Sequence, residues 1–159
     1  MQKKEFTHLN PEGNPTMVDV SEKKITTRTA IAQSILVLDE AIIERLEGDE
    51  IHTKKGPVFQ TAILAGIMAA KKTSDLIPLC HPLPLSKCQV DIQINEVKEV
   101  VIECLVKTTS QTGVEMEALT GASVAALTIY DMCKGFSHYI IIKETKLMKK
   151  TGGKSDFMR

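Results

Sequence analysis

The sequence of 159 residues contains no tryptophan, and aromatic residues make up only 4% of it. Aromatic side chains are the surfaces on which proteins stack unpaired bases, so their scarcity argues against binding of single-stranded RNA or DNA. A surplus of charge is also absent, because 20 basic residues balance 20 acidic ones. Proteins that bind duplex DNA normally carry a basic excess, so we expect no nucleic-acid partner.

Long apolar runs are missing as well. No run reaches the roughly 18 residues that cross a bilayer, and the first residues lack the pattern of a signal peptide. The four cysteines, Cys80, Cys88, Cys104 and Cys133, form no C-x-x-C pair. We therefore expect a cytoplasmic protein with reduced thiols, no membrane partner and no protein-bound metal.

The hydrophobic content of 43% is enough for one folded domain of this length. Residues 1–24 are polar and predict a flexible N-terminal arm. Residues 25–148 predict a single catalytic domain, and residues 149–159 a flexible tail rich in Gly and Lys. Among the last seventeen residues, six are basic and two acidic, so anions could collect there.

The hydrophobic pattern predicts an α+β fold. Strands are expected at residues 25–38, 90–94, 100–108 and 138–146, and helices at residues 39–46, 57–72 and 115–134. This order fits a ferredoxin-like α/β sandwich, in which helices cover one face of an antiparallel sheet, with one additional helix. Because the helices are rich in small residues, we expect their faces to bury subunit contacts.

Two residues near the end of the last expected helix, Asp131 and Lys134, lie one turn apart on an otherwise apolar face. They form either a surface ion pair or an acid/base pair that moves protons or holds an anionic substrate. At the start of the same helix stand Glu115, Met116 and Glu117. Acidic residues there complement the helix dipole, but only one of the two carboxylates is needed for that.

A loop at residues 76–85 is held rigid by three prolines, and it carries Leu79, Cys80 and His81. The last two are either a buried thiol beside a loop histidine or a nucleophile or metal pair. Adjacent residues of an extended chain point to opposite sides, which disfavours a dyad between them. The string Lys-Thr-Gly-Gly-Lys-Ser at 150–155 lacks the earlier glycine of a P-loop, but its lysines suit contact with phosphates.

Several strings together resemble the molybdenum cofactor biosynthesis protein C family, the cyclic pyranopterin monophosphate synthases. The resemblance covers nearly the whole chain. Its most specific strings are Met-Val-Asp-Val-Ser at 17–21, Leu-Ile-Pro-Leu-Cys-His-Pro-Leu at 76–83, Thr-Gly-Val-Glu-Met-Glu-Ala-Leu-Thr at 112–120 and Ala-Leu-Thr-Ile-Tyr-Asp-Met-Cys-Lys at 126–134.

The resemblance implies an activity and a set of site residues. The implied reaction converts 3',8-cyclo-7,8-dihydro-GTP to cyclic pyranopterin monophosphate with release of pyrophosphate, which makes the protein a lyase. By position, the resemblance implies catalytic roles for Asp131, Lys134 and Lys55. It implies substrate contacts for Leu79, Cys80, His81, Met116, Glu117, Glu115, Arg28 and Lys150.

The same resemblance implies a homohexamer, built as a trimer of dimers, with the active site at a dimer interface. No cofactor is certain, although Mg²⁺ accompanying the substrate triphosphate is chemically reasonable. Two alternatives remain open: a non-catalytic module that binds nucleotide triphosphates, and an assembly scaffold. Neither alternative would need Asp131.

Overall fold

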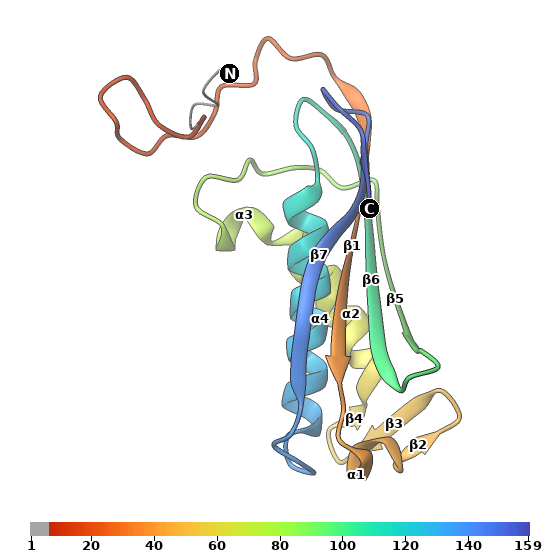
Figure 1. Ribbon diagram of the computed structural model, residues 1–159. Coiled ribbons are helices and arrows are strands. Elements are labelled where there is room, and N and C mark those ends of the chain that lie inside the picture. Colours follow the sequence, from red (N-terminus) through yellow and green to blue (C-terminus); the bar gives the residue numbers. More distant parts are fainter. Residues whose placement is uncertain (1–6) are drawn as a thin grey trace.

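The computed structural model describes residues 7–159, and a five-stranded antiparallel sheet forms the centre of that part of the chain (Figure 1). The strand order is β5-β6-β1-β7-β8. The bounds are β1 Thr26–Val37, β5 Lys87–Ile94, β6 Glu99–Ser110, β7 Ile141–Thr151 and β8 Phe157–Met158. Strands β1 and β6 pair over their whole length, from Thr26 opposite Ser110 to Val37 opposite Glu99.

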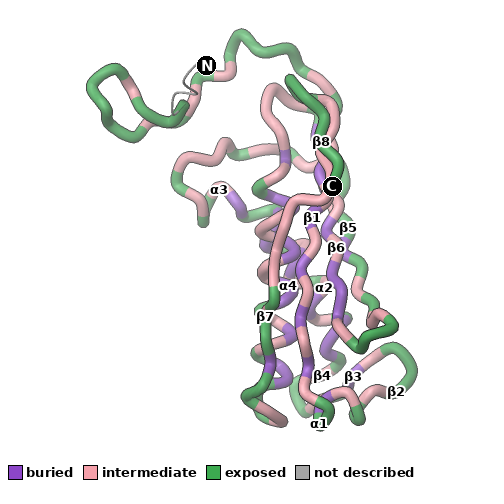
Figure 2. Tube along the Cα trace, viewed as in Figure 1, coloured by how far each residue is buried: buried purple, intermediate pink, exposed green. Residues whose placement is uncertain are grey.

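Two long helices, α2 (Val58–Lys71) and α4 (Glu115–Cys133), lie together on one face of this sheet (Figure 1). Alternate residues of β1 are fully buried beneath them: Ala30, Ala32, Ser34 and Leu36. Figure 2 shows this burial concentrated between the helices and the sheet. The architecture confirms the predicted α+β, ferredoxin-like class. No helix in residues 7–159 is both long and apolar enough to cross a membrane.

The expected helix at residues 39–46 is wrong in its second half. Helix α1 covers only Glu40–Ile43, and a small sheet follows, made of β2 (Leu46–Glu47), β3 (Glu50–Thr53) and β4 (Gly56–Pro57). The chain reverses at Gly48, whose φ of 68° favours glycine. This reversal lets Ile51 become fully buried against the core, which a continued helix would prevent.

The other helix and strand predictions are confirmed to within a few residues, apart from the last strand. A short helix, α3 (Thr73–Leu76), precedes the irregular loop that the prolines predicted. Strand β7 begins three residues later than expected and continues to Thr151, so residues 149–151 belong to the sheet rather than to a tail. Just beyond β7, the Gly152 carbonyl accepts a hydrogen bond from the Thr26 hydroxyl at 2.6 Å, which holds Gly152 beside β1. Residues 157 and 158 also belong to the sheet, because β8 pairs with residues 149 and 150 of β7. Flexibility of residues 152–156 and of the N-terminal arm stays a prediction, and residues 1–6 of that arm lie outside the described residues.

Helices α2 and α4 cross at two glycines, Gly66 and Gly121. A Cβ added to Gly66 would lie 2.8 Å from the Gly121 carbonyl oxygen, and one added to Gly121 would lie 2.6 Å from the Cys104 sulfur. The backbones are therefore in direct contact at this point. This close approach fixes how the two helices sit on the sheet, and with them the two ends of α4.

We expect Gly121→Ala to destabilise the protein by about 1 kcal/mol in urea unfolding. Overpacking costs about 1–3 kcal/mol, which outweighs the roughly 1 kcal/mol that alanine gains over glycine inside a helix. The double variant Gly121→Ala/Cys104→Ala should recover part of the loss, because the new methyl group then fills the space of the thiol. Wild-type stability in the single variant would contradict this account of the crossing.

Candidate active site

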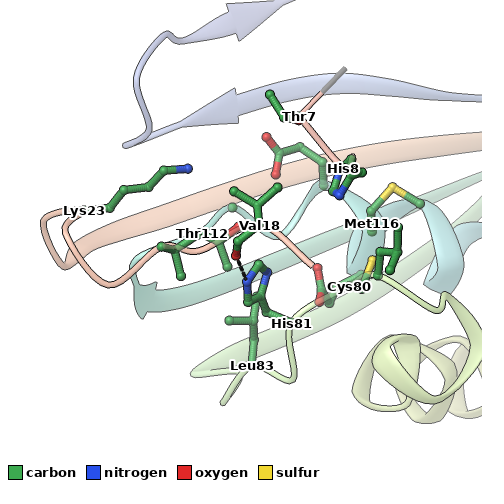
Figure 3. Close-up of a pocket in the computed structure, with 14 residues that line it drawn as sticks. Thr7, His8, Val18, Lys23, Cys80, His81, Leu83, Thr112 and Met116 are labelled. Atoms are coloured by element: carbon green, nitrogen blue, oxygen red, sulfur yellow. Dashed lines mark hydrogen bonds between the residues drawn. The ribbon is translucent and has the colours of Figure 1, made fainter. Parts of the chain in front are cut away.

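A cavity of about 300 Å³ lies where the proline-rich loop meets the amino end of α4 (Figure 3). We call it the histidine cavity. The loop and the helix supply six of the eight residues for which the resemblance implied substrate contact: Leu79, Cys80, His81, Glu115, Met116 and Glu117. The Thr108 hydroxyl of β6 donates to the Pro84 carbonyl at 2.6 Å, so the loop is anchored to the sheet. The structure thus brings two distant strings of the sequence into one site.

His81 has a defined hydrogen bond in this cavity. Its Nε2 lies 2.7 Å from the carbonyl oxygen of Val18 (Figure 3). A carbonyl can only accept, so Nε2 carries a proton and donates it. In the neutral ring, Nδ1 is then left as an acceptor.

Cys80 is not set up as a nucleophile. Partial burial, and after it the charge of Glu117, raises the pKa of the Cys80 thiol. The thiol therefore stays protonated, and the nucleophile hypothesis loses its support because the thiolate is the reactive form. Within residues 7–159, no three His, Cys, Asp or Glu side chains gather as a metal site would require.

Glu117 is the buried acid of the histidine cavity, with only 4% of its surface exposed. Burial, followed by the nearby charge of Glu115, raises the pKa of Glu117. In its protonated form, this carboxyl group can donate a hydrogen bond to a ring nitrogen or oxygen. Glu115 has a different role, since its carboxylate lies 3.2 Å from the Lys150 ammonium.

The raised pKa of Glu117 predicts an effect of pH on stability. The folded state keeps this proton to higher pH than the unfolded state, so stability falls as pH rises from the ordinary glutamate range through the folded-state pKa. We expect Glu117→Gln, which cannot ionise, to raise the melting temperature more at pH 8 than at pH 4. Melting curves of both proteins across this range test it, and parallel curves would contradict it.

A second cavity, of about 220 Å³, adjoins the first, and we call it the basic cavity. Four cationic residues line it: Lys23, Arg28, Lys150 and Lys154. The two cavities share Lys23, Thr112, Gly113 and Glu115. Four cations against one carboxylate suit a polyanion such as a diphosphate or triphosphate, and the amino end of α4 adds its positive dipole.

The three residues predicted to be catalytic form a separate cluster at the other end of α4. Asp131 accepts from the Lys134 ammonium at 2.8 Å and from the Lys55 ammonium at 3.1 Å. All three side chains are about half exposed. Hydrogen bonds from Lys134 and then Lys55 lower the pKa of Asp131, and Asp131 in turn raises the pKa of Lys134. The cluster is therefore a carboxylate held between two cations.

The two groups of predicted site residues lie far apart within one chain. Glu117 and Asp131 are fourteen positions apart on α4, which is about 21 Å along the helix axis. This distance is too large for both residues to reach the same reacting atoms. Within one chain, the structure therefore brings the predicted substrate-contact residues to two adjoining cavities but does not place Asp131 beside them.

Some lining residues were missed in the sequence. The clearest is Lys23, which lies in the segment that we expected to be a flexible arm, yet lines both cavities. Its position two residues after the string at 17–21 is the only available signal. Thr112 and Gly113 also line both cavities, and they belong to the string at 112–120 that carried the resemblance.

The fold and the cavities define a class of protein. It is an α+β protein in which the basic cavity adjoins the histidine cavity, and this pair of cavities suits a ligand that joins phosphates to a heterocyclic ring. The model of the MoaC family matches residues 17–153. The chain belongs to the MoaC family.

Three relatives show how far this similarity extends. The chain is 57% identical over 155 residues to a molybdenum cofactor biosynthesis bifunctional protein of Synechocystis, covering 95% of the chain and 45% of that relative. It is 49% identical over 172 residues to molybdenum cofactor biosynthesis protein 1 of Dictyostelium discoideum, covering 98% and 27%. It is 50% identical over 151 residues to the cyclic pyranopterin monophosphate synthase of Xanthomonas campestris, covering 95% and 92%. The chain thus spans less than half of the first two relatives and nearly all of the third.

Proposed function

We propose that this chain is a cyclic pyranopterin monophosphate synthase that acts in molybdenum cofactor biosynthesis. Its substrate is 3',8-cyclo-7,8-dihydro-GTP, and its products are cyclic pyranopterin monophosphate and pyrophosphate. The observation that carries the proposal is the shared wall of the two cavities, which suits a ring system in one and phosphates in the other. The similarity to the Xanthomonas synthase over 92% of its length supports it.

The basic cavity suits the phosphate step. A sugar hydroxyl attacks the α-phosphorus, a new oxygen–phosphorus bond forms, and the bond to the bridging oxygen of the leaving pyrophosphate breaks. Negative charge grows on the leaving group, so fixed cations lower the barrier. Arg28 is held for this role by its Nε, which donates to the Ser110 carbonyl at 3.1 Å. Lys150 is positioned by Glu115.

The ring rearrangement requires protons to move on and off ring nitrogens and carbons. Asp131, Lys55 and Lys134 are the groups proposed for this work. The ion pair lowers the pKa of Asp131 and raises the pKa of Lys134, so without substrate Asp131 is a carboxylate and Lys134 an ammonium. Separation of this pair by the substrate would make Asp131 a stronger base and Lys134 a stronger acid, as proton transfer requires. In the histidine cavity, Glu117 and His81 offer hydrogen bonds that orient the ring.

The active site is proposed to form between two copies of the chain. The separation of about 21 Å along α4 supports this, because the Asp131 cluster of one copy can approach the cavities of another. Large apolar side chains are exposed on α4 and on its neighbour α2: Leu127 on α4, and Leu64 and Met68 on α2. A homohexamer, built as a trimer of dimers, would cover them.

Mg²⁺ belongs to this proposal only as a companion of the substrate triphosphate. Phosphate oxygens and water are the ligands it prefers, so it needs no dedicated protein site. We also propose that the protein works in the cytoplasm, which accords with four free cysteines.

One assay tests the proposal against its alternatives. Purified protein is incubated with 3',8-cyclo-7,8-dihydro-GTP, and both pyrophosphate and a pterin product are measured. A synthase releases both together. Tight binding without either product would favour a nucleotide-triphosphate-binding module, and neither binding nor turnover would favour an assembly scaffold.

A further inference from the structure

The N-terminal segment at residues 7–24, which we call the strap, forms one wall of the histidine cavity. It contributes Thr7, His8, Val18, Val20 and Lys23 to the lining. Figure 1 shows the strap leaving the end of β1 and extending away from the sheet before it turns back. The cavity is therefore closed on this side by a segment outside the sheet and helices.

The strap reaches the cavity twice because it folds back on itself. Leu9 pairs with Pro15, and the Thr16 amide donates to the His8 carbonyl at 2.9 Å. Gly13, with a φ of 80°, makes the reversal possible. This hairpin returns His8 to the neighbourhood of Val18, so that both line the same cavity.

The strap has few ties to the rest of the chain. In the described residues, its backbone carbonyls accept two side-chain hydrogen bonds from the body, one from His81 to Val18 at 2.7 Å and one from Gln111 to Ser21 at 3.2 Å. Most strap residues are exposed, including Thr7 and His8. Such a segment can open and close without disturbing the core.

We propose that the strap is a lid over the ring of the bound substrate, and that His8 is a ligand-contact residue. This inference rests on the proposed function. The His8 ring lines the cavity together with Met116 and Cys80 (Figure 3). It is exposed, so its polar and flat surfaces are available to a heterocycle. Because His81 holds the strap through Val18, closure of the strap and the orientation of His81 are linked.

The lid has a chemical purpose in the proposed reaction. A ring that is being opened and rebuilt is vulnerable to water, and a closed cavity excludes water while the protons are moved. His8 on the strap and His81 on the loop then lie on different walls of the same cavity. The substrate itself would complete the contact between strap and body.

Steady-state kinetics of His8→Ala test this inference. We expect KM for 3',8-cyclo-7,8-dihydro-GTP to rise about tenfold, because one neutral contact with the ring is lost. The matched control is His138→Ala, since His138 is an exposed histidine outside all the cavities described. It should keep the wild-type KM.

Hydrogen exchange supplies a second measurement. With the substrate bound to Asp131→Asn, we expect amides of residues 8–18 to exchange more slowly than without it. The lid alone would be overturned if the wild-type protein forms the pterin, KM is unchanged in His8→Ala, and exchange in the strap is unchanged by substrate. Absence of pterin from the wild-type protein would overturn the proposed function and the lid with it.

Discussion

Asp131→Asn is expected to abolish formation of the pterin product while leaving the protein folded. The amide keeps the size of the side chain but can neither take up a proton nor neutralise its two lysines. Loss of a general acid or base lowers kcat by roughly 10²–10⁴. Because the Asp131 side chain is 54% exposed, the melting temperature should change little. Single-turnover assays of the pterin measure the effect.

Lys134→Ala provides the companion test, and it should lose product formation in the same way. A spectroscopic readout separates catalysis from folding: the pKa of Lys134, raised by Asp131, should fall in Asp131→Asn when followed by NMR. Turnover close to that of the wild type in either variant would remove the catalytic assignment. An unchanged pKa would show that the ion pair is not formed in solution.

A mixture of two inactive variants is expected to regain activity. Asp131→Asn removes the carboxylate at one end of α4, and Lys150→Ala removes a cation from the basic cavity at the other end. If each active site takes one end from each of two copies, random assembly gives about one quarter of the sites both intact halves. Co-refolding the two variants in equal amounts should therefore yield about one quarter of wild-type turnover.

The controls for this mixture are the two variants refolded separately and the wild type refolded alone. Activity must exceed the sum of the separate variants, since each could retain a trace of its own. If the mixture shows no more than that sum while mixed oligomers are present, each site lies within one chain. That result would contradict the shared site but leave the synthase activity standing.

Much of the fold was accessible from the sequence, because local patterns determine it. The glycine and alanine spacing of residues 57–72 and the alternation in residues 100–108 each specify an element without help from the rest of the chain. The small sheet β2-β3-β4 was not accessible, because its strands are only two to four residues long. What forms them is the burial of Ile51, a tertiary effect.

The candidate site was only partly accessible. Neighbours in a string, such as Cys80 and His81, could be named because they share one loop. The distance between Glu117 and Asp131 follows from the length of the helix. Only the structure shows that the fold of one chain leaves Asp131 away from the cavities. The contribution of the strap to the cavity was missed because polar residues with glycine and proline are typical of a mobile arm, which has no defined place beside a site. Its position depends on the carbonyl of Val18, which carries no information in the sequence.

Helix α4 sets the distance and the relative orientation between two groups of charged residues. One end holds Glu115 beside Lys150, and the other holds Asp131 beside Lys55 and Lys134. One inserted residue would turn one end by about 100° relative to the other and lengthen the helix by about 1.5 Å. Both sets of partners could not then be kept. On the proposed function, the chemistry therefore depends on the length of α4, and we expect substitutions along α4 to be tolerated better than insertions or deletions.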